Sequence, residues 1–354
     1  MKKIRIVRQH QPLKWGYIFI FFIALGLSLG IGAILLSLQG KPPLKGIALL
    51  FQGAFGAGYA IEDSLIKAVP IFLCSLGVAL SFRLQMWNIG AEGQYALGAI
   101  GATCMALNFP QLPWFVLLPL MFLAASVCGG IWGLIPALLK LKINVNEIIV
   151  TLMLNYIGIL FLEYLVYGPW KDPTSFGFPI TPEFSPQAIV GTIPGTRLNW
   201  GIIFCVLIGV VMTVFFRYTR LGYELKVCGE NLRAARYARM PYAFLIIMVM
   251  VVSGALAGSA GFLEVSANLN RLQTSVMAGY GYTAIVVAWL ARLNPLYIGI
   301  ASFLLAGLRV GVENLQLEMG IPAAFGAILE GLILLSVLAG GFFREYKLVI
   351  REKS

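Results

Sequence analysis

Long apolar runs, separated by short polar connections, follow one another along the whole chain. A helix that crosses the roughly 30 Å hydrocarbon core of a membrane needs about 20 predominantly apolar residues. The run at 278–291 is shorter, so we expect it to be tilted, broken or sheltered by its neighbours. The pattern predicts an all-α, polytopic membrane protein with about ten spans, at residues 15–38, 64–82, 90–108, 114–139, 147–167, 199–216, 243–262, 278–291, 295–311 and 323–342.

Lysine and arginine gather in alternate connections between these runs. If the N-terminus is cytoplasmic, 19 of the 26 Lys and Arg residues fall in connections on the cytoplasmic side and five on the other side. Positive charge favours the cytoplasmic side of a membrane protein. The distribution therefore predicts that both termini are cytoplasmic.

The composition agrees with a membrane protein: 59% of residues are hydrophobic and 12% are charged, and the mean hydropathy is +0.87. The net charge of +11 is spread over short connections beside the spans, so we expect no nucleic-acid partner. Membrane lipids are the surroundings that this composition predicts.

Few residues could carry catalysis or hold a metal. The five cysteines stand singly, and the only histidine is His10, so neither a His-based triad nor a His-rich metal site is expected. The chain lacks a phosphate-binding Gly-x-x-x-x-Gly-Lys-Ser/Thr motif, because Gly40-Lys41 is followed by Pro42 and has no leading glycine. We expect no enzyme activity and no cofactor in this chain.

A basic, amphipathic stretch at 217–242 lies between two apolar runs. It holds six of the Lys and Arg residues. Asn231 precedes Leu232-Arg233-Ala234-Ala235, a pattern that predicts a short helix with Asn as its N-cap. It is either a docking helix for another protein or a solvated positive loop.

The longest connection on the other side, 168–198, is rich in Pro and Gly and contains little from which to build a domain. We expect it to form a lid or ledge on the extracytoplasmic face. Residues 1–354 are therefore predicted to be a single transmembrane domain.

The third apolar run opens with Met86-Trp87-Asn88-Ile89-Gly90-Ala91-Glu92-Gly93-Gln94, which places polar side chains and glycines at a membrane boundary. A carboxylate such as Glu92 is costly within a span unless it faces partners or water. It could tie helices together or contact a transported molecule. The polar side chains within spans are candidates for lining a translocation path, and each could equally bond helix to helix: Asn88, Glu92, Gln94, Thr151, Asn155, Ser253, Thr283 and Glu330.

Pairs of glycines at Gly-x-x-x-Gly spacing predict close helix packing at Gly26 and Gly30, Gly254 and Gly258, and Gly307 and Gly311.

Three strings in order resemble the permease subunits of ATP-binding-cassette importers in the ribose, branched-chain amino acid and nucleoside group. The first is NIGAEGQ at 88–94. The second, GENLRAARYA at 229–238, is similar to the family's cytoplasmic coupling segment, and the third, 279–295, is similar to its late signature. Within the family, the first two strings most resemble the nucleoside branch.

The resemblance implies a type II-like permease of a bacterial cell membrane, fed by an extracytoplasmic binding lipoprotein and paired with a second permease subunit. A separate ATPase subunit would hydrolyse ATP and bind the coupling segment, whose implied residues are Gly229, Glu230, Asn231, Arg233, Ala234, Ala235, Arg236 and Tyr237. Arg239-Met240 departs from the family pattern, which usually has Gly and an aliphatic residue there.

The resemblance implies uptake of nucleosides, with purine nucleosides favoured and a simple sugar such as ribose as the alternative. A secondary carrier coupled to protons through Glu92, Glu264 or Glu330 is a rival of a different class. A membrane-embedded enzyme would need clustered acids or histidines, which the sequence does not show.

Overall fold

Helices make up most of the computed structural model, which describes residues 3–8, 16–322, 324–329, 331–332, 335–336 and 346–351. Glu330 and much of the predicted last span, 323–342, lie outside these residues. The α-helices are α1 (Gly16–Leu38), α2 (Pro43–Phe55), α3 (Gly58–Arg83), α4 (Ala91–Asn108), α5 (Trp114–Ile143), α6 (Glu147–Tyr167), α7 (Gly201–Tyr218), α8 (Arg220–Glu230), α9 (Leu232–Tyr237), α10 (Tyr242–Leu263), α11 (Tyr280–Leu290) and α12 (Pro295–Met319).

Six helices of the described residues are long and apolar enough to cross a membrane. They are α3, α5, α6, α7, α10 with its continuation to Leu269, and α12. The protein is therefore a helical, multi-pass membrane protein, while the count of ten spans and their orientation stay predictions. Helix α2 was not expected from the sequence, and α11 has only 11 residues. It is about 16 Å long, half of a membrane core.

Two strands near the ends of the chain pair with each other in the described structure. Strand β1 (Lys3–Arg8) pairs with β2 (Tyr346–Arg351) in antiparallel register, from Lys3 opposite Arg351 to Arg8 opposite Tyr346. Both strands contain the β-branched residues Ile and Val, which favour a strand, and β1 alternates basic and apolar residues over its first four positions. The all-α prediction therefore holds for the helical body and misses this pair.

The chain divides into two compact units, residues 1–61 with 308–354 and residues 62–307. In the first unit, α2 packs against the second half of α12. Asn314 donates a hydrogen bond of 3.0 Å from Nδ2 to the carbonyl oxygen of Leu49. A Cβ added at Gly311 would lie 2.2 Å from the carbonyl oxygen of Leu50, so these two helix backbones touch.

Helices α4, α5 and α10 form the core of the second unit, where small residues let backbones touch. A Cβ at Gly254 would lie 2.2 Å from the carbonyl oxygen of Gly129, and a Cβ at Gly258 would lie 2.3 Å from that of Ala125. The close packing predicted at Gly254 and Gly258 is thus confirmed. A Cβ added at Gly26 or Gly30 in the first unit meets no described atom within 4 Å, so close packing at this pair stays a prediction.

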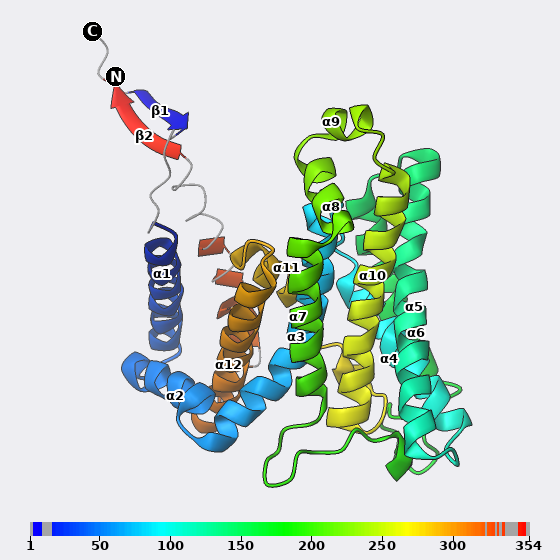
Figure 1. Cartoon of the computed structure of the whole chain (residues 1–354). Helices are drawn as coiled ribbons and strands as arrows, with labels where there is room; N and C mark the ends of the chain where they lie inside the picture. The colour runs from blue at the N-terminus through cyan, green and yellow to red at the C-terminus, as the bar shows by residue number, and fades with distance from the viewer. Residues whose placement is uncertain are drawn as a thin grey trace. The chain divides into compact units, whose positions relative to one another are not determined.

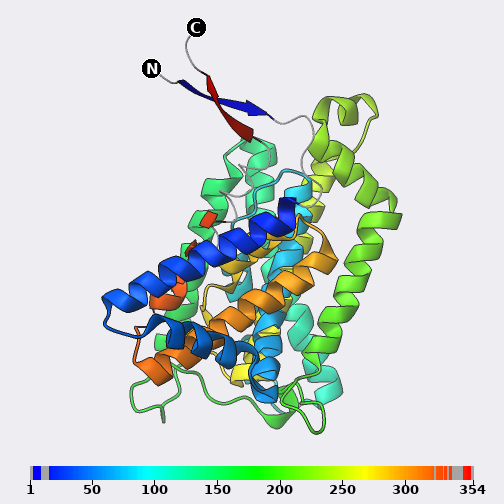
Figure 2. The ribbon, with the colours of Figure 1, turned by 90° about the vertical axis from the view of Figure 1, so that its left-hand side faces the viewer.

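The two ends of the second unit carry different structures. Figure 1 shows α8 and α9 at one end, beside the α5–α6 turn, and the connection 168–200 at the other. In Figure 2, α8 and α9 (yellow-green) stand at the upper end of α7. The connection is irregular except for a short 3₁₀ helix, η1 (Pro186–Ala188).

The connection is held along its length by the segment that follows α10. That segment contains the π-helix η2 (Glu264–Leu269) and the 3₁₀ helix η3 (Thr274–Val276). Backbone N–H groups of the connection donate to carbonyls of the segment, with hydrogen bonds of 3.0, 2.9 and 3.0 Å: Thr181 to Leu272, Phe184 to Asn270, and Val190 to Ser266.

Candidate functional site

The chain leaves helical geometry between α3 and α4, at residues 84–90. Asn88 of this segment donates from Nδ2 to Ser253 Oγ at 2.9 Å. Ser253 lies 11 residues into the 22-residue helix α10. Irregular backbone at such a depth must be satisfied by protein or water. The segment therefore dips from the end of α3 to the middle of the helical bundle, where α4 begins.

Polar side chains satisfy the backbone of this segment. Asn88 and Gln94 exchange amide hydrogen bonds of 3.1 and 3.2 Å, and Asn88 Oδ1 accepts from the N–H of Gly90 at 2.9 Å. From α6, Asn155 Nδ2 donates to the carbonyl of Ile89 and its Oδ1 accepts from the N–H of Gly93, both at 2.8 Å. These bonds tie α4, α6 and α10 to one another.

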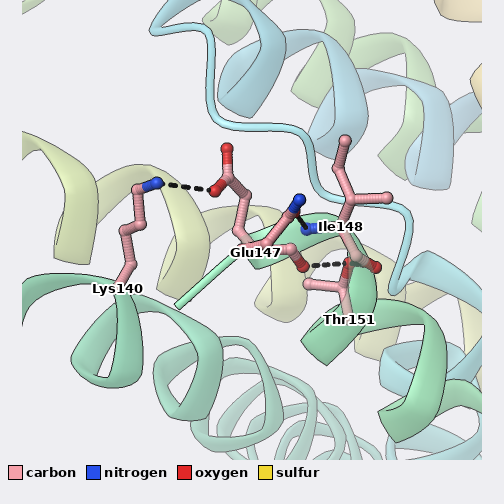
Figure 3. A network of polar contacts seen from close by, with 5 residues as sticks. Lys140, Glu147, Ile148 and Thr151 are labelled. Carbon is pink, nitrogen blue, oxygen red and sulfur yellow. Dashed lines mark hydrogen bonds and ion pairs between the residues drawn. The ribbon is translucent and has the colours of Figure 1, made fainter. Parts of the chain in front are cut away.

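Thr151 links the same segment to the first turn of α6. Its hydroxyl donates to the carbonyl oxygen of Glu147 at 2.7 Å and accepts from the N–H of Ile89 at 3.3 Å. The carboxylate of Glu147 pairs with Lys140 of α5 at 3.0 Å, and Figure 3 shows both contacts of Glu147. The α5–α6 turn is thereby joined to the irregular segment.

Glu92, in the first turn of α4, binds the beginning of α11. Its Oε1 accepts from the N–H of Gly279 at 3.0 Å and its Oε2 from the N–H of Gly281 at 2.6 Å. Gly279, the N-cap of α11, has a left-handed φ of 78°. Because a carboxylate stabilises the positive end of a helix dipole, Glu92 stabilises the starts of both α4 and α11.

The seven described path candidates are all buried. Thr283, the last of them, donates to the carbonyl oxygen of Gly279 at 3.2 Å. In this conformation, the other six side chains bond to one another or to backbone across different helices and the irregular segment, whereas this bond of Thr283 stays within the start of α11. Their contact with a transported molecule stays a prediction. Glu330 lies outside the described residues.

The basic segment folds as its sequence predicts. Asn231 Oδ1 accepts from the N–H groups of Arg233 and Ala234, both at 3.1 Å, and caps α9. Arg233, Ala234, Arg236 and Tyr237 are exposed, Tyr237 at 94%. Ala235 is 1% exposed, so it packs inside this chain and is not accessible to a partner in this conformation.

Gly229 joins α8 to the end of α3. A Cβ at this position would lie 2.0 Å from the carbonyl oxygen of Arg83. Arg83 in turn donates from Nη2 to the carbonyl oxygen of Leu293 at 2.8 Å, and its guanidinium lies 3.6 Å above the ring of Phe216 of α7. One residue therefore contacts α8, α7 and the turn that follows α11.

Arg239, where the family usually has glycine, lies in the turn after α9. This residue has a φ of 53°, a left-handed conformation that favours glycine. The N–H of Met240 reaches back to the carbonyl oxygen of Ala235 at 3.0 Å, as in a Schellman motif. The turn forms with arginine in a position that suits glycine.

Sequence reasoning missed the junction at Arg83. It counted this arginine only as a positive charge at the end of a span, because its partners Phe216, Gly229 and Leu293 are far from it in the sequence.

Residues 60–338 match the family described as the branched-chain amino acid transport system permease component. The glucose ABC transporter permease protein TsgB13 of Haloferax volcanii is 34% identical over 91% of this chain and 87% of its own length. The guanosine ABC transporter permease protein NupP of Bacillus subtilis is 32% identical over 91% and 93%. The nucleoside ABC transporter permease protein NupB of Lactococcus lactis is 29% identical over 90% and 88%.

Among solved structures, the PsaBC complex of Streptococcus pneumoniae with Fab covers 83% of this chain and 95% of the matched chain. The identity is 15% and the TM-score is 0.46.

Proposed function

We propose that this chain, which belongs to the family of permease components of branched-chain amino acid transport systems, carries nucleosides into the cell. Purine nucleosides are the first candidates. It is a multi-pass permease subunit of an ABC importer, a transport component without an ATPase site of its own. Such a permease works with an ATPase and a solute-binding protein.

The observation that carries the choice of substrate is the similarity to guanosine and nucleoside permeases over about nine-tenths of the chain. The glucose permease, at 34% identity, makes a simple sugar the second candidate. A nucleoside and a sugar share a neutral ring with hydroxyl groups, which one family of pores can accommodate with few changes.

The ATPase subunit binds the exposed face of α9 in this proposal. Arg233 and Arg236 offer guanidinium groups that suit acidic side chains of a partner, and the small exposed side chain of Ala234 allows close approach. Glu230 and Tyr237 complete the exposed surface. Gly229 and Ala235 are buried and Asn231 caps α9 at the surface, so these three residues position α8 and α9.

We propose the rest of the assembly by analogy with other permeases of the family. The segment 217–242 and both termini lie in the cytoplasm, and the connection 168–198 faces the extracytoplasmic binding protein, a lipoprotein. A second permease subunit completes the pore in a bacterial cell membrane. ATP is hydrolysed by the partner, and this chain holds no cofactor.

Uptake by proteoliposomes tests the proposal. The chain is reconstituted with its ATPase, its second permease subunit and its binding protein, and uptake of guanosine, adenosine, ribose and glucose is measured with ATP inside. We expect ATP-dependent uptake of guanosine and adenosine. Uptake of glucose or ribose alone would contradict the nucleoside proposal, and uptake that needs a proton gradient but no ATPase would contradict the importer.

Variants on the exposed face of α9 test separately whether the ATPase binds there. Arg233→Glu with Ala234→Glu should abolish co-purification of the ATPase and uptake, while the protein still inserts into the membrane. Lys45→Glu is the matched control, since it reverses an exposed charge on α2. Unchanged co-purification of the double variant would overturn the docking assignment.

A further inference from the structure

Helix α11 exposes one face that carries two aromatic side chains. Tyr282 is 37% exposed and Trp289 is 43% exposed. They lie seven residues apart, two helical turns or about 10 Å, and therefore on the same side of the helix. Ile285 and Val286 between them are half-buried, whereas most other residues of α11 are buried. The exposed face is thus a narrow stripe along a half-length helix.

Trp87, from the irregular segment 84–90, extends this stripe. Its ring stacks on that of Trp289, with centroids 5.6 Å apart and planes at 19°. Phe82 supports both rings, at 5.1 Å from Trp87 and 5.9 Å from Trp289. We call Trp87, Tyr282 and Trp289 the aromatic strip. Its rings are held by packing, so it offers a preformed stacking surface.

The position of Tyr282 argues that the strip faces a polar path. Tyrosines that anchor a protein at the membrane surface lie at span ends. Tyr282 instead lies in the first turn of α11, directly after Gly281, whose backbone N–H donates to Glu92 in the middle of the bundle. Its hydroxyl accepts from Asn155 Nδ2 at 3.4 Å.

The backbone beside the strip points the same way. The segment 84–90 is not helical, and its Gln85 is exposed. Irregular backbone at membrane depth occurs where it is buried in protein or lines a water-filled cavity, and not against lipid. Trp87 belongs to this segment, so its half-buried ring faces protein or water rather than lipid.

We propose that the aromatic strip is the surface on which the base of the transported nucleoside stacks as it passes through the permease. The proposal rests on the proposed function. Every nucleobase has a flat π-face, and stacking on an aromatic side chain accepts one base as well as another. The hydroxyl of Tyr282 adds a hydrogen-bonding group beside the stack. The strip therefore suits a permease whose selectivity lies in its binding protein.

Uptake by the complete reconstituted complex tests this inference. For Trp289→Ala and Tyr282→Leu, the guanosine concentration for half-maximal uptake should rise about tenfold, the scale of one lost stacking contact. Trp289→Phe should restore most of the loss, since it keeps a ring. ATPase activity of the complex should stay near that of the wild type. Trp114→Ala, which removes a 64% exposed tryptophan at the start of α5, should have no effect.

Photolabelling locates the base directly. With 8-azidoguanosine as the probe, light should attach the label to peptides that contain Tyr282 or Trp289, and excess guanosine should prevent it. Labelling confined to other helices, or normal uptake by the double variant Trp289→Ala with Tyr282→Leu, would overturn the strip while nucleoside transport stands. A wild-type complex that transports glucose but no nucleoside would overturn the proposed function and the base-stacking role together.

Discussion

The Oε2 atom of Glu92 accepts a hydrogen bond of 2.6 Å from the backbone N–H of Gly281, across 189 positions of the chain. With the second bond to Gly279, this contact joins the first turn of α4 to the first turn of α11. Two helices that start in the middle of the bundle thus meet at one carboxylate. The geometry resembles the discontinuous helices of other transporters, whose positive ends point toward a common site.

Replacing Glu92 with Gln should destabilise the protein, because an amide retains one acceptor oxygen and presents a donor to the other N–H group. We expect a loss of about 1–3 kcal/mol in the free energy of unfolding, and more for Glu92→Ala. Thermal unfolding in detergent, followed by tryptophan fluorescence, measures it. Glu318→Gln on the exposed end of α12 is the control. Equal melting temperatures for both variants and the wild type would show that the carboxylate is dispensable.

Gly229→Ala should separate α8 from the end of α3, because the new Cβ would lie 2.0 Å from the carbonyl oxygen of Arg83. Overpacking of this kind costs about 1–3 kcal/mol. We also expect the complex to hydrolyse ATP with less uptake per ATP, since α8 loses its contact with the spans. The ratio of uptake to ATP hydrolysis measures this effect.

The control for Gly229 is Gly58→Ala, where a Cβ meets no described atom within 4 Å. A normal ratio of uptake to ATP hydrolysis and normal stability for Gly229→Ala would mean that the contact with Arg83 does not couple α8 to the spans.

Arg239→Gly should stabilise the turn after α9, since glycine adopts a φ of 53° without the steric cost that arginine bears. We expect a gain of about 0.5–1 kcal/mol, after the larger entropy of glycine in the unfolded chain is subtracted. Chemical denaturation of the detergent-solubilised protein checks it. Arg236→Gly, inside α9, should change stability in the opposite direction. A loss of stability for Arg239→Gly would contradict the left-handed turn.

Cys228 should react slowly with maleimides while α8 stays in place. Burial raises the pKa of its thiol, the charge of Glu224 adds to the shift, and its sulfur lies 3.9 Å from that of Met240. A raised pKa lowers the thiolate fraction at pH 7 and therefore the rate, and raising the pH should restore it.

The measurement uses a variant without the other four cysteines, at Cys74, Cys104, Cys128 and Cys205. Labelling of the folded protein at pH 7 should be slower than after unfolding in detergent. Ala234→Cys in a background that also lacks Cys228 is the exposed control. Equal rates at the two positions in the folded protein would mean that Cys228 is accessible.

The pattern of the sequence was sufficient for features that depend on neighbouring residues. Asn231 caps α9 because its side chain reaches N–H groups two and three residues ahead. The described apolar runs are helical because a backbone in hydrocarbon must satisfy its hydrogen bonds within one segment. The three ordered strings identified the family, which the match over 60–338 confirms.

Tertiary structure decided which polar side chains meet. Sequence showed that Asn88, Glu92 and Asn155 needed partners, because polar groups within a membrane are costly. It could not show that Asn88 binds Ser253 or that Glu92 binds Gly281, since these contacts join residues 165 and 189 positions apart. Likewise, only the folded chain places Ala235 inside and Trp289 on a surface. Local spacing determines helices and caps, whereas the rotation and depth of each helix depend on packing against the others, and this decides what a residue touches.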